Sequence, residues 1–204
     1  EGLALAKARR EALAQEIRRN PSRALELAAP WRWRHELPEE VAALLEESIS
    51  GRGKLEVYCA LPLPGADYQE FAGGAIRYVT LNHKTYRAYV YGRRLRQMSR
   101  KDIALHGIAV DNSMAVSEEP LRTMEADEAQ AALAGAKAAV APVCALCGGS
   151  SSDVGRPVLA DYGSQVLSFC HESHVAELSR ALVAAEETLT VTSAASGVGD
   201  IPPP

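Results

Sequence analysis

Three cysteines and one histidine in the last third of the chain have the types and spacing of a metal site. Cys144 and Cys147 form a Cys-x2-Cys pair, 22 residues follow, and Cys170 and His174 form a Cys-x3-His pair. Zinc favours four thiolate or imidazole ligands in a tetrahedron, and two ligand pairs from separate segments supply them well. If a helix begins near Cys170, residues four apart lie on one face of it. The pattern predicts one structural zinc ion, because four protein ligands close the coordination shell.

Two interpretations compete with this zinc site. Cys144 and Cys147 could instead form a redox disulfide, or the isolated Cys59 could bridge to one of the clustered cysteines. The first would leave the third clustered cysteine without a role, and the second requires a distant segment to reach the pair. His171 is the rival to His174 as fourth ligand, but a ligand directly beside a cysteine has poor geometry for one tetrahedral centre.

The segment between the ligand pairs predicts how they are brought together. Residues 157–160 and 166–169 are apolar runs on either side of a turn sequence, which is typical of a hairpin. A knuckle, a hairpin and a ligand at a helix start form a treble clef, which we expect over residues 142–187. A segment this small builds too small a hydrophobic core to be stable without a further cross-link. Structural zinc can contribute on the order of ten kcal/mol of coupled binding and folding.

The ligand sequences are similar to those of a known finger type. Gly148 directly follows the first pair, and the second half reads Phe169-Cys170-His171-Glu172-Ser173-His174. This pattern resembles the treble-clef fingers of the TRASH/YHS type, in which a hairpin ends in Phe-Cys and the fourth ligand comes soon after. His174 stands where a cysteine is usual in that type, so the resemblance gives little support for metal sensing or delivery.

The elements upstream of the finger predict an α+β protein that opens with helices. Residues 1–50 form the expected N-terminal helical region, with helical periodicity over 3–19, a short second helix to residue 29, and a third over 41–48. We expect its two tryptophans to pack beneath the following sheet; they are Trp31 and Trp33.

Residues 51–125 change to a period of two, which is typical of half-buried strands. Hairpins are expected around the turns at 82–84 and 111–113, and residues 120–124 could add a last short strand. Five or six short strands with tight turns predict a small curved β-sheet or an OB-like barrel.

A linking helix and a tail complete the predicted order. An alanine-rich helix over 126–139 lies within a linking segment at 126–141 that leads into the finger. Residues 188–204 are expected to form a tail, with a strand over 188–193 and an extended, proline-ended linker. A linker of this kind suggests that the chain is the front piece of a longer polypeptide.

A basic run follows the second predicted hairpin strand and is the one candidate binding surface. Beside Tyr86, Tyr89 and Tyr91 it could line a groove for a single-stranded nucleic acid. The net charge of −4 favours an exposed loop whose charge is balanced by nearby acids, so nucleic acid is the less favoured partner. The basic residues are Arg93, Arg94, Arg96, Arg100 and Lys101.

No complete catalytic signature is present in the sequence. His35-Glu36 and His171-Glu172 do not extend to His-Glu-x2-His, and the glycine pairs lack the spacing of a phosphate loop. Sets such as Ser99, His106 and Asp111 occur by chance in a chain of 204 residues. We therefore expect a non-enzymatic protein.

Residues 3–124 carry scattered patches that are similar to a known leader domain. The patches include residues 20–28, 37–41, 50–57 and 106–111. They resemble the domain ahead of the catalytic part in large secreted bacterial proteins such as gametolysin-like zinc metallopeptidases. The resemblance implies a non-catalytic role in folding, masking or positioning the downstream part of the polypeptide.

Partner and compartment are inferred from the same considerations. The sequence contains no run of 18 apolar residues, so no membrane-spanning helix is predicted. The start at Glu1 indicates either a removed leader peptide, for which a secretory signal is the commoner cause, or a fragment; together with the leader resemblance it favours a secreted, extracytoplasmic protein. Zinc bound by reduced cysteines is commoner inside cells, so a cytoplasmic location is the alternative. The expected partner is protein, either downstream parts of the same polypeptide or further copies of the chain.

Overall fold

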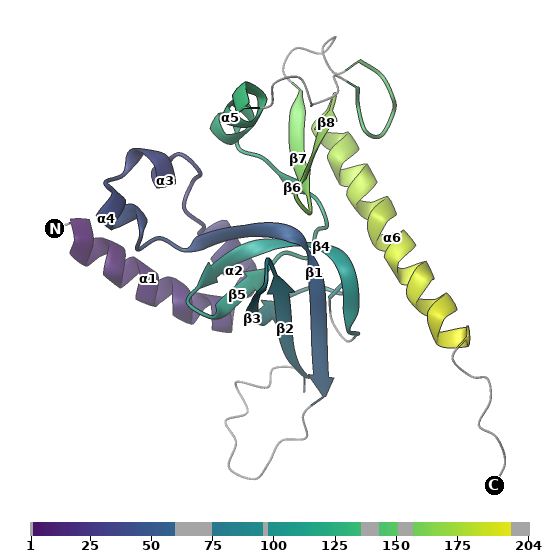
Figure 1. Ribbon diagram of the computed structural model, residues 1–204, viewed down its shortest axis with the longest axis horizontal. Helices are drawn as coiled ribbons and strands as arrows, with labels where there is room; N and C mark the ends of the chain where they lie inside the picture. Colours follow the sequence, from purple (N-terminus) through teal and green to yellow (C-terminus); the bar gives the residue numbers. More distant parts are fainter. Residues whose placement is uncertain (1, 60–74, 96–97, 136–142, 151–156, 197–204) are drawn as a thin grey trace, which may run out of the picture.

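The computed structural model describes residues 2–59, 75–95, 98–135, 143–150 and 157–196. They form an α+β protein in which a closed five-stranded barrel lies between N-terminal helices and a small three-stranded sheet (Figure 1). The predicted α+β class is confirmed, and so is the small barrel. The second half of the tail, residues 197–204, lies outside the described residues.

The barrel uses five consecutive strands in the order β1-β2-β3-β5-β4. The β2–β3 and β4–β5 pairs are antiparallel hairpins, as the turn sequences predict, and the parallel pairing of β3 with β5 helps to close the barrel. The strands are β1 (Glu47–Cys59), β2 (Ala75–Leu81), β3 (Lys84–Val90), β4 (Arg100–Val110) and β5 (Ser113–Val116).

Strand β1 is longer than the sequence predicts and begins earlier. Its first half pairs with β4 and its second half with β2, and the register shifts between Gly53 and Leu55. A Cβ on Gly53 would lie 2.3 Å from the Thr80 carbonyl oxygen, so only glycine allows this approach. Gly51 and Gly53 therefore lie inside one continuous strand, which bends at the register shift. The predicted helix over 41–48 is wrong beyond residue 42, and residues 47–50 are strand.

The barrel buries apolar side chains on both faces of β4 and β5. Inward side chains such as Leu55, Val79 and Met114 fill the interior. On the outer face, Ile108 and Ala115 pack against two helices that cover this side of the barrel. These helices are α1 (Gly2–Arg19) and α2 (Pro21–Glu26), and they contribute Leu13, Ile17 and Ala24.

A buried carboxylate joins the remaining N-terminal elements to the barrel. The Glu46 side chain is 0% exposed and pairs with Arg9 of α1 and with Arg34 of α3 (Trp33–Glu36). The Ala29 N–H also donates to it, at 2.5 Å. α4 (Glu39–Ala42) lies just before it in the chain. Ion pairs therefore hold this region together.

The two tryptophans lie outside this buried network. Trp31 stacks on His35 with 3.9 Å between ring centroids, and Trp33 is 39% exposed. The expectation that both would pack under the sheet is wrong.

The C-terminal third forms a second, three-stranded sheet and a long helix. The predicted hairpin is confirmed as β7 (Val158–Tyr162) and β8 (Gln165–Phe169). β6 (Arg122–Thr123) confirms a short strand within 120–124, but it pairs with β7 and so joins this sheet instead of the barrel. The linking helix α5 (Ala126–Gly135) is also confirmed, and residues 136–142 lie outside the described residues.

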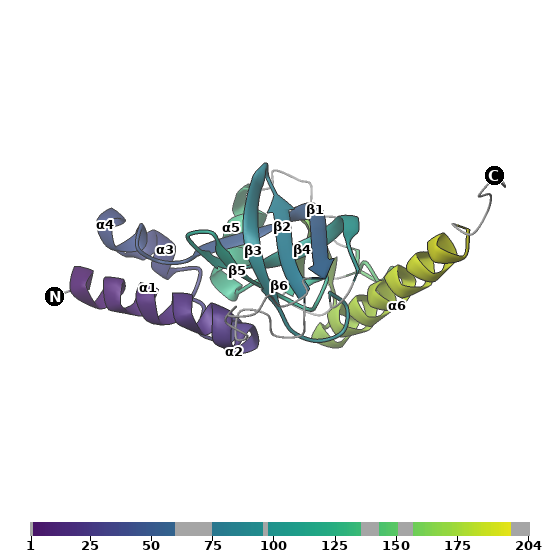
Figure 2. The same cartoon turned by 90° about the horizontal axis from the view of Figure 1, so that it is seen from below.

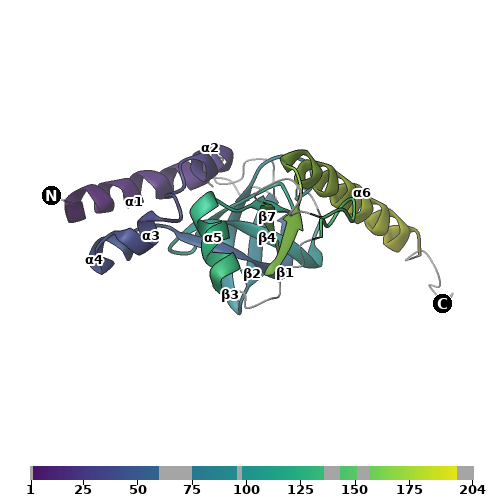
Figure 3. The same cartoon turned by 90° about the horizontal axis from the view of Figure 1, so that it is seen from above.

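The long helix α6 (Glu172–Ser196) replaces the strand that we expected over 188–193. β-branched residues there favour a strand locally, but adding a residue to an existing helix needs no new nucleus. Figures 2 and 3 show α1 and α6 on opposite sides of the barrel. None of the helices among the described residues is long and apolar enough to cross a membrane.

Candidate metal centre

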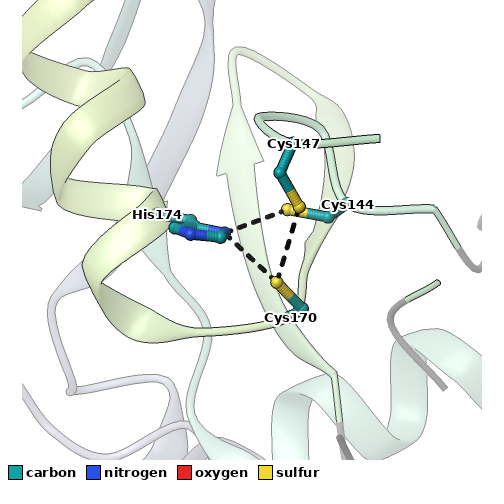
Figure 4. A group of neighbouring side chains, drawn as sticks. All are labelled: Cys144, Cys147, Cys170 and His174. Carbon is teal, nitrogen blue, oxygen red and sulfur yellow. Dashed lines mark hydrogen bonds between the residues drawn. The ribbon is translucent and has the colours of Figure 1, made fainter. Parts of the chain in front are cut away.

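The four predicted ligands come together at one point beside β8. Cys144 and Cys147 lie in a short loop, Cys170 directly follows β8, and His174 lies in the first turn of α6 (Figure 4). Their ligand atoms all lie within 4.8 Å of one another. The four residues that the sequence predicts as ligands thus form one cluster that could hold a metal ion.

Local backbone geometry presents the first two sulfur atoms to this point. Gly148 has a φ of +71°, a left-handed conformation that glycine adopts without strain. The Gly148 N–H donates to the Cys144 carbonyl at 3.0 Å, and the Cys144 N–H donates to the Gly149 carbonyl at 2.8 Å. The Gly149 N–H also donates to Cys147 Sγ, at 3.4 Å. The loop is thus a closed knuckle that holds both thiols on one side.

Three of the distances between ligand atoms are close to the edges of a small tetrahedron. Zinc bonds of about 2.3 Å to sulfur and about 2.0 Å to nitrogen imply S···S edges of about 3.8 Å and S···N edges of about 3.5 Å. Cys147 Sγ and Cys170 Sγ are 3.8 Å apart. His174 Nδ1 lies 3.4 Å from Cys144 Sγ and 3.1 Å from Cys170 Sγ. The donors therefore fit a zinc ion in size as well as in chemical type.

The electrostatics of the three thiols also suit a divalent cation. Burial raises the pKa of Cys144, but backbone N–H groups of Cys147, Cys170 and Leu146 and the His174 ring outweigh it and bring that pKa to about 5. The pKa of Cys170 rises to about 11, because of burial and the two neighbouring thiols. Three thiolates this close repel one another, and a bound cation removes that cost.

A small apolar core supports the ligands. Phe169 is fully buried beside Cys144, and Val175 of α6 closes the cluster from the helix side. Leu121, from the segment that leaves the barrel, packs into the same core. The elements that carry the ligands therefore pack around one apolar core. The segment that leaves the barrel contributes to the same core.

The competing interpretations of these residues find less support. Cys144, Cys147 and Cys170 are free thiols, so no disulfide joins any of the three. The side chain of Cys59 lies outside the described residues. The ring of His171 is directed to Ser173, whose Oγ lies 2.9 Å from Nδ1, and His171 is absent from the cluster.

The predicted basic surface is divided by the fold. Arg94 is buried, not exposed as we expected for a loop, and its guanidinium pairs with Glu186 of α6, as does that of Arg100. Arg93 and Lys101 are exposed, and Arg96 lies outside the described residues. Sequence reasoning missed the role of Arg94 because its partner is 92 residues away.

The residues considered for catalysis are engaged in separate places. Ser99 Oγ accepts a hydrogen bond from the Val57 N–H at 2.9 Å, and Asp111 pairs with Arg10 at 2.6 Å. His106 is buried in β4, where burial and the positive charge of Arg122 lower its pKa to about 4. These three residues do not share a site.

A polar cavity of about 330 Å³ lies where the N-terminal helices, β1, α5 and β7 meet. Its charged groups largely satisfy one another. Arg122 donates to both carboxylate oxygens of Glu128, at 2.8 and 2.6 Å, and Glu125 accepts from the Trp31 N–H at 3.0 Å. The cavity thus lies at a contact between elements whose charged groups are already largely paired.

Comparison of the chain with protein-family models, with curated proteins and with solved structures gives no significant match. The resemblances to TRASH/YHS-type fingers and to secreted leader domains therefore stay predictions. Function has to be inferred from the geometry of the site and of the barrel.

Proposed function

We propose that this chain is a non-enzymatic module of a larger protein, in which one structural zinc ion staples a treble-clef finger to an OB-type barrel. The observation that carries the proposal is the closed set of four ligand atoms within 4.8 Å. Four protein ligands leave zinc no open position for water or substrate. The metal then stabilises the fold, and the activity of the module lies in its surfaces.

The two fold types are supported by connectivity. A knuckle, a hairpin and a helix that carries the fourth ligand follow in the order of a treble clef. The barrel strand order and the parallel β3–β5 pair agree with a five-stranded Greek-key barrel of the OB type. The finger is fastened to the barrel at its hairpin, where Arg52 of β1 lies over the Tyr162 ring at 5.7 Å.

Protein contact is the mode of action that the exposed surface favours. Large apolar side chains are exposed on the N-terminal helical region, among them Leu5 at 72% and Leu27 at 44%. Exposed apolar side chains of this size can contribute to an interaction surface. The occupant would be a downstream part of the same polypeptide or a second copy of the chain, with a role in folding, masking or assembly.

Two measurements test this proposal. Native mass spectrometry of the purified chain should give one zinc ion per chain, and a cobalt-substituted sample should show the visible absorption of a tetrahedral thiolate site. Sedimentation over a range of concentrations should show association that Leu5→Glu weakens. Leu133→Glu, at another exposed leucine on α5, is the control. A metal-free chain would contradict the staple, and a chain that stays monomeric would contradict association between copies.

A single-stranded nucleic acid is the second candidate partner, and one feature of the barrel favours it. On the outer face of β1, β2 and β3, Tyr58 is 53% exposed and meets Tyr78 edge-on at 6.1 Å. The Arg87 guanidinium lies 5.7 Å from the Tyr78 ring and 5.9 Å from the Tyr89 ring. Aromatic rings beside arginine can stack bases and contact phosphates.

Binding of a short fluorescent oligothymidine at low salt tests the nucleic-acid candidate. Tyr58→Ala should weaken the binding, and added salt should weaken it further. Leu133→Ala removes an exposed apolar side chain on α5, outside β1, β2, β3 and the basic run, and should leave binding unchanged. No binding at low salt would rule out this candidate.

A further inference from the structure

Helix α6 is attached to the rest of the protein at two separated points. His174, in its first turn, belongs to the metal cluster, and Glu186 binds the barrel 12 residues later. At 1.5 Å per residue the two points are about 18 Å apart along the helix. Between them, Val175 and Leu178 pack into the finger core, and Ser179 Oγ donates to Glu119 at 2.5 Å.

The attachment at the barrel is a buried arginine–carboxylate pair. The Arg94 side chain is 0% exposed, and its Nε and Nη2 donate to the two carboxylate oxygens of Glu186 at 2.8 Å each. Arg94 Nη2 also donates to the Ala104 carbonyl at 2.9 Å, and Arg100 Nη1 donates to Glu186 at 2.9 Å. Side-on pairing of this kind fixes both position and orientation.

Among the ion pairs of the described residues, Arg94 pairs with one carboxylate, that of Glu186 on α6. A buried guanidinium that loses its carboxylate is strongly destabilised, so Arg94 has to gain solvent when α6 moves away. The start of α6 is in turn held by the cluster, since Cys170 directly precedes the helix and His174 lies in its first turn. The metal ligands and the arginine pair therefore constrain the same rigid element.

We propose that α6 is a metal-dependent clasp: metal binding at the Cys144, Cys147, Cys170 and His174 cluster closes α6 on the barrel and buries Arg94, and metal loss opens it. This inference rests on the proposed metal site and adds a regulated surface to it. The open form exposes two guanidinium groups, those of Arg94 and Arg100, which suit an acidic partner. In the closed form the Glu186 carboxylate pairs with both guanidinium groups, in the place that an acidic group of the partner would take.

Coupling of this kind acts in both directions. If metal binding favours the closed helix, a change that weakens closure must weaken metal binding by the same factor. Glu186→Gln keeps the shape of the side chain but removes its charge, so it should lower zinc affinity on the order of tenfold. Glu177→Gln, an exposed position on the same helix, should leave zinc affinity unchanged.

Arginine modification on the full chain tests the clasp directly. Phenylglyoxal reacts with exposed guanidinium groups, and mass spectrometry reports each site. In the zinc-loaded protein Arg94 should be protected, and removal of zinc by a chelator under reducing conditions should speed its modification about tenfold or more. Arg18 and Arg19, which are exposed on α1, serve as internal references whose rates should not change.

The outcomes separate the clasp from the metal site. One zinc per chain, with Arg94 equally protected before and after zinc removal, would overturn the clasp and leave the metal site intact. A chain that binds no metal would overturn both. Because Glu186→Gln could disturb folding, Arg100→Lys provides a milder variant that keeps the Arg94–Glu186 pair, and it should weaken zinc binding less than Glu186→Gln.

Discussion

Glu186 of α6 receives two hydrogen bonds of 2.8 Å from the buried guanidinium of Arg94, across 92 residues of sequence. This contact places α6 against the barrel. The metal cluster lies at the N-terminal end of the same helix. The finger, the helix and the barrel therefore depend on one another, and substitutions at separate positions can test that dependence.

The two histidines near the second ligand pair should differ sharply when each is replaced. His174→Ala removes a ligand and should lower zinc affinity by more than the 10- to 100-fold that loss of a supporting contact costs. His171→Ala removes only an exposed ring that contacts Ser173 and should leave affinity unchanged. Competition with a chromophoric chelator measures both. Equal loss of affinity in the two variants would contradict the ligand assignment.

Glu46 should be the most sensitive ionisable position in the N-terminal region. Its removal leaves Arg9 and Arg34 beside a buried site without a carboxylate, so Glu46→Ala should cost about 3–5 kcal/mol in the free energy of unfolding. Glu26→Ala breaks an exposed pair with Arg23 and should cost less than about 1 kcal/mol. Urea unfolding of the two variants measures the difference, and similar costs would show that the Glu46 network contributes little.

His106 should make the protein less stable in acid. Its pKa is about 4 in the fold, lowered by burial and by Arg122, and near 6.5 when unfolded. The unfolded chain therefore binds the proton first, so this stability is present above pH 6.5 and is lost as the pH falls towards 4. The loss amounts to about 3 kcal/mol.

Urea unfolding of the wild type and of His106→Gln at pH 7 and pH 5 measures the His106 effect. Metal loss in acid affects both proteins, so the difference between them reports His106 alone. An unchanged pH dependence in His106→Gln would show that this histidine is not the source.

Two glycines should differ in their tolerance of alanine. A Cβ on Gly107 of β4 would lie 2.0 Å from the Ala115 carbonyl oxygen, whereas a Cβ on Gly135 of α5 meets no atom within 4 Å. Gly107→Ala should therefore cost about 2 kcal/mol or more, and Gly135→Ala should change stability by less than about 1 kcal/mol. Thermal melts of both variants distinguish them, and a tolerated Gly107→Ala would contradict the close pairing of β4 with β5.

Patterns with local causes predicted much of this molecule. Ligand spacing identified Cys144 and His174 as parts of one cluster, because the type of donor and its position on a helix are both visible in sequence. Turn residues placed the hairpins around 82–84 and 111–113, and the period of two predicted a small curved sheet or barrel. In each case the information lies within a few residues.

Long-range contacts account for the features that sequence reasoning missed. Gly53 looks like a break, but it bends β1 because Thr80 of another strand passes close by. Residues 188–193 favour a strand locally, and a helix that begins at Glu172 extends through them. Arg94 looks like part of an exposed basic loop, and only Glu186 of α6 explains its burial. None of these partners is close in sequence.

The most direct test of the metal site is a zinc and free-thiol titration of the native protein, made before and after chelation. We expect one zinc per chain, cysteine thiols that are protected until zinc is removed, and loss of C-terminal structure with the metal. A chain without zinc, in which Cys144, Cys147 or Cys170 is oxidised to a disulfide in its native state, would contradict the metal centre and the clasp that depends on it.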